Sequence, residues 1–254
     1  MEYFTKQDSI VRQIWGKSDT IMFVFAGAAA EFALNKEVDW LYYTGKLPSD
    51  PLGRLFSTVA YARAIVFAEK GEALKAIDTI KGIHSAVEIK RGAIIPDRAY
   101  RDVLFMLIDY SIRAYELLER KMTDAEKREA FDVFYRVGSR MGIRGLPETL
   151  EGFEIMRERQ MAANMVYSQF TADLFRQYRK HLGIIRYRLL LEAQILVAPK
   201  KVLVMLGMWR WSLLAPVVCV YKIFRLMKLD WLLKELILPK QYKSEIKSLD
   251  VRMG

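Results

Sequence analysis

The sequence predicts an all-α protein. Long segments place apolar residues three and four positions apart, which is the spacing of one face of an α-helix. Runs that alternate apolar and polar residues, the signal of a half-buried strand, are scarce. Helix-start residues such as Asp50 and Thr123 and helix-stop glycines such as Gly71 and Gly92 bound several of these segments. We therefore expect a bundle of helices without a sheet.

The first two segments with helical periodicity span residues 8–16 and 19–36. The second contains Gly27-Ala28-Ala29-Ala30, whose small side chains permit close approach of either another helix or a flat ligand. Glu31 follows in the same apolar segment, where an unpaired buried carboxylate is costly. Glu31 is therefore a pocket acid, the partner of an arginine, or a solvent-facing residue. Glu37 is a second candidate acid.

A third helix is expected over residues 51–70. Asp50 is a good N-cap residue, and Pro51 is favoured at the first helical position. Arg54 and Thr58 are four residues apart in this helix and therefore lie on one face, a turn apart.

The next helix is expected over residues 72–91. Its apolar positions have the spacing of a core-facing stripe, and they are Ile77, Ile80, Ile83 and Val87. His84 lies on or beside this stripe. The residues alone leave two interpretations of His84, a core histidine bonded to a backbone carbonyl or a metal ligand. Glu88, one turn later, either orients the imidazole or lies on a solvated face.

The rest of the chain continues the helical pattern. Thr123 and Glu126 form the capping-box pattern at the start of one segment. We expect helices over residues 97–120, 124–141, 148–195 with a break near 168–171, 200–209 and 212–237.

Length and composition predict one domain over residues 1–254. A chain of 254 residues with 52% hydrophobic content can bury a sizeable core, and no linker or repeat divides it. Cys219 is the only cysteine, which excludes an intrachain disulfide and a cysteine-based zinc site. The first residues lack a signal-peptide pattern, so we expect an intracellular, cytoplasmic protein, with membrane association left open. The absence of a nucleic-acid-binding motif argues against nucleic acid as a partner.

The net charge of +10 is concentrated at the C-terminal end. Residues 200–254 contain eleven Lys and Arg against four Asp and Glu. Residues 202–220 form an apolar run interrupted by one charge, Arg210, between Trp209 and Trp211. Three interpretations remain open for this region: helices packed in the core, a surface-lying amphipathic anchor that contacts membranes peripherally, or a spanning helix.

Several motifs resemble one enzyme family. These are Asp50-Pro51-Leu52-Gly53-Arg54-Leu55 with Thr58, then Ile83-His84 with Val87, then Pro96 to Tyr100, and Gly142 to Thr149. Together with the segment 232–239 they resemble the haem-b oxygenases that include the rubber oxygenases (latex-clearing proteins) and the MpaB oxygenase. The resemblance covers residues 10–240.

The resemblance implies a globin-like helical core that encloses a pocket for haem b. At matching positions, His84 resembles the proximal iron ligand, and Arg54 and Thr58 resemble residues of the distal haem pocket. The implied activity is oxidation of an apolar, isoprenoid-like substrate by dioxygen, with Arg54 and Thr58 as catalytic residues and Arg54 also as a haem-binding residue.

The chain departs from the family pattern in two core segments. The region 25–32 lacks a Gly-Gly-x-Arg segment, and residues 106–108 read Met-Leu-Ile where Trp-Val-His is typical. The alternative to an oxygenase is therefore a non-catalytic haem-binding or membrane-associated helical protein, or a family member that has lost haem.

Overall fold

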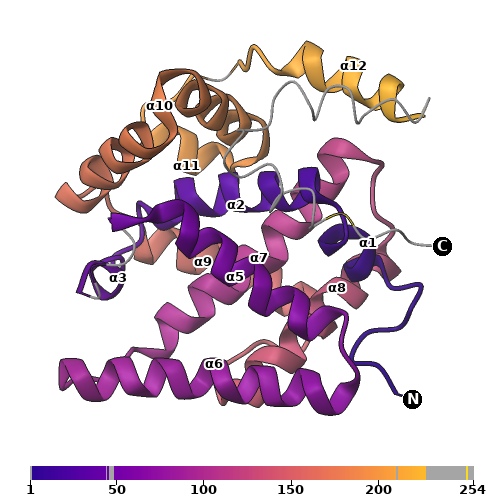
Figure 1. Cartoon of the computed structure of the whole chain (residues 1–254), viewed down its shortest axis with the longest axis vertical. Coiled ribbons are helices and arrows are strands. Elements are labelled where there is room, and N and C mark those ends of the chain that lie inside the picture. Colours follow the sequence, from indigo (N-terminus) through magenta and orange to yellow (C-terminus); the bar gives the residue numbers. More distant parts are fainter. Residues whose placement is uncertain (1, 44, 46–48, 210, 227–249, 251–254) are drawn as a thin grey trace.

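A computed structural model describes residues 2–43, 45, 49–209, 211–226 and 250 (Figure 1). Within these residues the extended pairings are two isolated bridges, Tyr3 with Glu69 and Asn35 with Met165, and there is no sheet. The all-α prediction is confirmed. The described helices are α1 (Ile10–Trp15), α2 (Ser18–Phe32), α3 (Asp39–Tyr43), α5 (Pro51–Val66), α6 (Lys70–Arg91), α7 (Asp97–Leu118), α8 (Asp124–Met141), α9 (Leu150–Asn164), α10 (Gln169–Val197), α11 (Lys200–Met205) and α12 (Ala215–Leu226).

Helices α5 and α6 form a hairpin with a short connection. The Asp50 side chain caps α5 by accepting a hydrogen bond of 2.9 Å from the Gly53 N–H, as expected. Helix α6 begins at Lys70, earlier than expected, because the N-terminal segment holds the connection: the Lys70 N–H donates to the Glu2 carbonyl at 2.8 Å. In Figure 1 the two helices meet at this connection and move apart toward the start of α5 and the end of α6.

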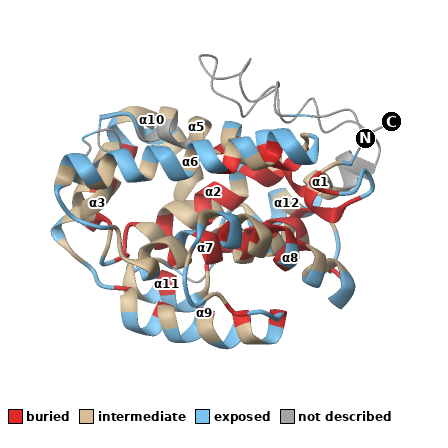
Figure 2. Cartoon of the chain, turned by 90° about the horizontal axis from the view of Figure 1, so that it is seen from below, coloured by how far each residue is buried: buried red, intermediate tan, exposed pale blue. Residues whose placement is uncertain are grey.

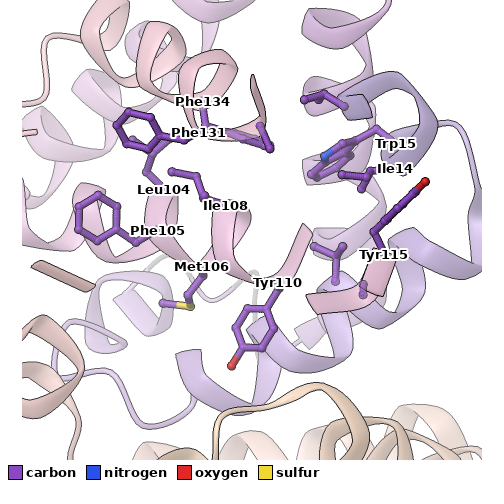
Figure 3. Packing of buried hydrophobic residues seen from close by; sticks show 14 of the residues in the cluster. Ile14, Trp15, Leu104, Phe105, Met106, Ile108, Tyr110, Tyr115, Phe131 and Phe134 are labelled. Atoms are coloured by element: carbon purple, nitrogen blue, oxygen red, sulfur yellow. The ribbon is translucent and has the colours of Figure 1, made fainter. Parts of the chain in front are cut away.

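The core lies where α2 packs against α7, with α1 and α8 at one side. Trp15 is fully buried, and its ring lies 6.1 Å, centroid to centroid, from both Phe25 and Phe134. Figure 3 shows the neighbouring residues of α7, among them Leu104 and Ile108, pointing into the same cluster. In Figure 2 the buried residues gather along the inward faces of these helices, while exposed residues lie on their outer faces.

The expected break in the segment 148–195 is confirmed. Helix α9 ends at Asn164, and α10 begins at Gln169, where the Ser168 N–H donates a 2.9 Å hydrogen bond to the Thr171 hydroxyl. Helix α10 is kinked at Gly183, whose φ of 71° belongs to the left-handed region that favours glycine.

The apolar run at 202–220 does not form one helix in the described residues. Helix α11 ends at Met205, Gly207 turns the chain with a φ of 64°, and α12 begins only at Ala215. Across the part of the chain that the structure describes, none of the helices is both long and apolar enough to cross a membrane. The segments 227–249 and 251–254 lie outside the described residues, so most of the expected helix beyond Leu226 and the motif at 232–239 stay predictions.

Candidate functional site

His84 lies in the second half of α6 and is half-buried. Its imidazole packs edge-on against the Tyr100 ring of α7, with ring centroids 5.2 Å apart and an interplanar angle of 70°. The Nδ1 atom of His84 is buried. The prediction that the apolar stripe faces the core is confirmed for Ile77, which is fully buried. It is wrong for Ile83, whose side chain is 42% exposed. The His84 half of α6 is therefore only partly covered by other helices.

Glu88 fixes the ring that packs on His84. Its carboxylate accepts hydrogen bonds from the Tyr100 hydroxyl at 3.3 Å and from the Ile95 N–H at 2.9 Å. Burial raises the pKa of Tyr100, and the adjacent negative charge of Glu88 raises it further. The tyrosine therefore stays protonated and keeps donating to Glu88. Tyr100 was not identified as a site residue from the sequence, since contact with His84 depends on how α7 crosses α6.

Arg54 and Thr58 lie in the first half of α5, and Thr58 is half-buried. The side chain of Arg54 lies outside what the structure describes. Arg54 is twelve residues before the end of α5 and His84 fourteen after the start of α6, so both lie about 20 Å from the connection along their helices. The structure thus places the helical turns of Arg54 and His84 at the same, open end of the hairpin (Figure 1). The roles of Arg54, Thr58 and His84 stay predictions.

Three of the motifs that carry the family resemblance lie together. The Arg144 N–H donates to the Asp97 carboxylate at 3.2 Å, and Arg101 donates to the Arg144 carbonyl. These contacts dock the loop after α8 onto the first turns of α7, the helix whose Tyr100 touches His84. Gly142 makes the turn into this loop possible, because it ends α8 with a φ of 81°.

Helix α3 was not expected, and its side chains bind the end of α6. We call the contacts of Asp39, Trp40 and Tyr43 with Lys90 and Arg91 the clasp. Arg91 forms a 2.7 Å ion pair with Asp39, and its guanidinium lies 3.9 Å from the centroid of the Trp40 ring. The Tyr43 hydroxyl donates to the Lys90 carbonyl at 2.9 Å. Arg91 is seven residues, about two turns, after His84, so both residues lie near one face of α6. The clasp therefore acts at the end of the helix that carries the histidine.

Glu31 is the partner of an arginine, which settles the three interpretations of this residue. It is 3% exposed and forms a two-pronged ion pair with Arg157 of α9. Asp109 also accepts from Arg157, at 3.2 Å, and the Tyr110 hydroxyl donates to Glu31 at 2.9 Å. Burial opposes the charge on Arg157, but the charge and hydrogen bonds of Glu31 outweigh it and raise the pKa of Arg157. The group is a structural ion pair that joins α2, α7 and α9.

The small residues of α2 serve helix packing. A Cβ added to Gly27 would overlap the Tyr110 ring of α7 and would lie 3.0 Å from Val197 of α10. Glu37, the other candidate acid, is paired with Arg98 at 2.6 Å. Neither Glu37 nor Glu31 lies free in a pocket.

A second buried carboxylate lies beside this ion pair. Asp102 of α7 accepts hydrogen bonds from the amide groups of Asn35 at 2.8 Å and Asn164 at 2.9 Å. Burial raises the pKa of Asp102, although both amide hydrogen bonds act in the opposite direction. These bonds tie the segment just after α2 and the last residue of α9 to the second turn of α7.

The ligand chemistry available to a metal is limited among the residues that the structure describes. They contain no group of three or more His, Cys, Asp or Glu side chains that could hold a metal ion. His181, the other histidine, is half-buried on α10. A site built from these residues therefore depends on one histidine.

Comparison with known proteins places the chain in a family. The model of the catalytic domain of the ER-bound oxygenase mpaB/B' and rubber oxygenase matches residues 14–229, most of the chain. Neither the curated proteins nor the solved structures contain a significant match. The matched region includes α2, the α5–α6 hairpin with Arg54, Thr58 and His84, and the contacts that α7 makes with it. The chain belongs to the mpaB/rubber oxygenase catalytic-domain family.

Proposed function

We propose that this protein is a haem-b-dependent oxygenase that uses dioxygen to oxidise an apolar, isoprenoid-like substrate. The observation that carries the proposal is the place of His84. It is a half-buried imidazole at the open end of the α5–α6 hairpin, inside the region that matches an oxygenase catalytic domain. His84 is assigned as the proximal iron ligand.

The residues around His84 fit a haem better than a metal ion held by protein side chains alone. A haem group would need only one histidine from the protein to hold its iron. Apolar side chains are exposed along the same stretch of chain, with Ile83 at 42%, Ile89 at 83% and Ile94 at 81%. Exposed apolar side chains of this kind mark contact with an apolar ligand or partner. A flat apolar macrocycle suits both features.

The protein residues have distinct proposed tasks. When bound, haem supplies the activation of dioxygen. The Tyr100 ring, held by Glu88, limits the rotation of the His84 imidazole and so orients its ring nitrogens. Arg54, always charged, would supply positive charge to the pocket in which dioxygen is held. Thr58, one turn later on α5, supplies a hydroxyl donor to the same pocket.

The absorption spectrum of the purified protein tests the proposal. We expect a Soret band in the wild-type protein and its loss in His84→Ala, with helical circular dichroism retained. His181→Ala is the matched control, and it should keep the band. Unchanged haem content in His84→Ala would contradict the assignment and make His181 the candidate ligand.

Oxygen uptake with a polyprenyl substrate separates the remaining possibilities. An oxygenase consumes oxygen in the presence of this substrate, whereas a non-catalytic haem protein shows the Soret band without uptake. A protein without a Soret band after haem reconstitution would be a family member that has lost haem.

A further inference from the structure

The loop between α11 and α12 exposes large apolar side chains. Trp209 is 80% exposed, Trp211 is 87% exposed and Leu213 is 81% exposed. On α10, Ile184 and Ile185 are 66% and 78% exposed. Single exposed apolar residues are common on soluble proteins, but several on neighbouring segments mark an interaction site.

Helix α10 and the loop line one groove. Ile184, Ile185 and Leu213 line it together with Leu189 and Leu214, and its volume is about 530 Å³. Arg188 and Glu192 are the charged residues of its lining. We call the five exposed residues of α10 and the loop the tryptophan surface; they are Ile184, Ile185, Trp209, Trp211 and Leu213.

Glu192 holds the loop in place. Its carboxylate accepts a hydrogen bond from the Ser212 hydroxyl at 2.7 Å and another from the Leu213 N–H at 2.6 Å. The Ser212 hydroxyl in turn accepts from the Leu214 N–H at 3.0 Å, just before α12 begins. The exposed side chains are therefore carried by a loop whose backbone is anchored to α10. The Glu192 carboxylate is therefore hydrogen-bonded to the loop.

The charge pattern indicates the partner. Between Glu192 and Asp230 the chain has six basic residues and no acidic residue; the basic residues are Lys200, Lys201, Arg210, Lys222, Arg225 and Lys228. Arg188, which is exposed, adds a cation to the groove itself. Basic residues near an anionic lipid surface are attracted to it, and tryptophan is enriched at the level of the lipid headgroups.

We propose that the tryptophan surface docks the protein onto an anionic lipid membrane without spanning it. The apolar side chains enter the headgroup region, and Arg188 of the groove binds an anionic headgroup. In Figure 1, α10 and α12 lie at one end of the molecule, and α6 lies at the other. Docking therefore leaves the His84 region facing away from the membrane, and the proposal is independent of haem binding.

Sedimentation of the whole protein with lipid vesicles tests the proposal. We expect binding to phosphatidylcholine vesicles that contain phosphatidylserine, little binding to pure phosphatidylcholine, and release as salt concentration rises. The double variant Trp209→Ala/Trp211→Ala should weaken binding by about tenfold or more, since two large apolar side chains leave the interface. Ile89→Ala/Ile94→Ala is the matched control, because both isoleucines are about equally exposed but lie near the end of α6. This control should bind like the wild type.

A second pair of variants tests the charge. Arg188→Ala should weaken binding by about fivefold, the effect of one cation near an anionic surface. Lys81→Ala, which removes an exposed cation from α6, should leave binding unchanged.

Four results would overturn the proposal. They are equal binding to neutral and anionic vesicles, no binding to either, binding that resists both salt and carbonate extraction, and unchanged binding of the tryptophan variant. A protein that sediments in solution as a dimer, and becomes a monomer in Trp209→Ala/Trp211→Ala, would assign the surface to a second copy of the chain.

Discussion

The Tyr110 side chain makes two contacts with α2 that are one helical turn apart. Its ring lies directly on Gly27, and its hydroxyl donates a 2.9 Å hydrogen bond to Glu31. The ring is fully buried, and Glu31 is held by Arg157 at the same time. A close contact between α2 and α7 and the buried Glu31–Arg157 ion pair are therefore joined through one tyrosine.

Gly27→Ala is expected to destabilise the protein. The added methyl group overlaps a ring whose hydroxyl is bound to Glu31, and it would also lie only 3.0 Å from Val197. Overpacking of this kind costs about 1–3 kcal/mol of unfolding free energy, which urea denaturation measures.

Gly82→Ala on α6 is the matched control for this change. A Cβ at Gly82 meets nothing within 4 Å, so alanine there should stabilise the helix by about 0.5–1 kcal/mol. If Gly27→Ala and Gly82→Ala shift the midpoint of urea denaturation in the same direction, Gly27 is not required for close helix packing.

Arg157→Met is expected to cost more than any surface charge substitution. It leaves the buried carboxylate of Glu31 without its cation, and loss of one partner from a buried pair costs about 3–5 kcal/mol. Arg128→Met is the control, because Arg128 pairs with Glu151 on the surface, where such pairs contribute less than about 1 kcal/mol. In the double variant Glu31→Gln/Arg157→Met, stability should partly return. A loss equal to that of Arg128→Met would contradict a stabilising role for the pair.

The sequence predicted most of the helices and several of their ends, because these depend on neighbouring residues. Gly71 was wrong as a helix stop, since α5 ends at Val66 and Gly71 lies in the first turn of α6. The Asp50 cap, the capping box of Thr123 with Glu126 and the left-handed Gly92 after α6 were all found as expected. Helix α3 was missed, since five residues are too few to display a 3.6-residue period. Its stability comes from Arg91, which is distant in sequence.

The candidate site could be predicted only in part, because it depends on contacts between residues that are distant in sequence. Periodicity placed His84 in a helix, but it could not indicate that the buried stripe stops before Ile83 or that Tyr100 covers the imidazole. Glu31 illustrates the difficulty. Its partner Arg157 is 126 residues away, so the sequence left three interpretations that only the fold separates.

Glu126 gives a pH-dependent contribution to stability. The hydrogen bond from Arg120, together with the Thr123 N–H, lowers the pKa of Glu126 from 4.5 to about 2. A lowered folded-state pKa stabilises the protein above about pH 4.5, and this contribution is lost as the pH falls toward 2. Glu126→Gln should therefore lower the melting temperature at neutral pH. The corresponding loss of unfolding free energy should be less than about 1 kcal/mol.

The difference between Glu126→Gln and the wild type should shrink between about pH 4.5 and pH 2, since the wild-type carboxylate is then protonated too. Glu148→Gln, at an exposed loop position, is the control for general charge effects. A difference that stays constant over this range would show that the charge of Glu126 is not responsible.

Arg91→Lys is expected to loosen α3 without unfolding the protein. Lysine keeps the charge opposite Asp39 but loses the planar stacking on Trp40. Hydrogen exchange of the peptide that covers residues 37–43 should accelerate, while the global unfolding free energy changes little. Lys90→Ala is the control, because only the backbone carbonyl of Lys90 bonds to Tyr43. Unchanged exchange in Arg91→Lys would mean that stacking does not hold the clasp.

Variants of Arg54 and Thr58 test whether these residues act in catalysis or in haem binding under the proposed function. If Arg54 stabilises developing negative charge, Arg54→Ala should lower oxygen uptake by about 100-fold or more while haem content falls little. Thr58→Val should act in the same direction by about tenfold, the effect of one hydrogen bond of about 1.4 kcal/mol. Thr79→Val is the control, because this exposed hydroxyl on α6 bonds to the Lys75 carbonyl. It should change neither quantity. Equal loss of haem and turnover in Arg54→Ala would instead make Arg54 a structural or haem-propionate-binding residue, since a purely electrostatic role leaves the cofactor in place.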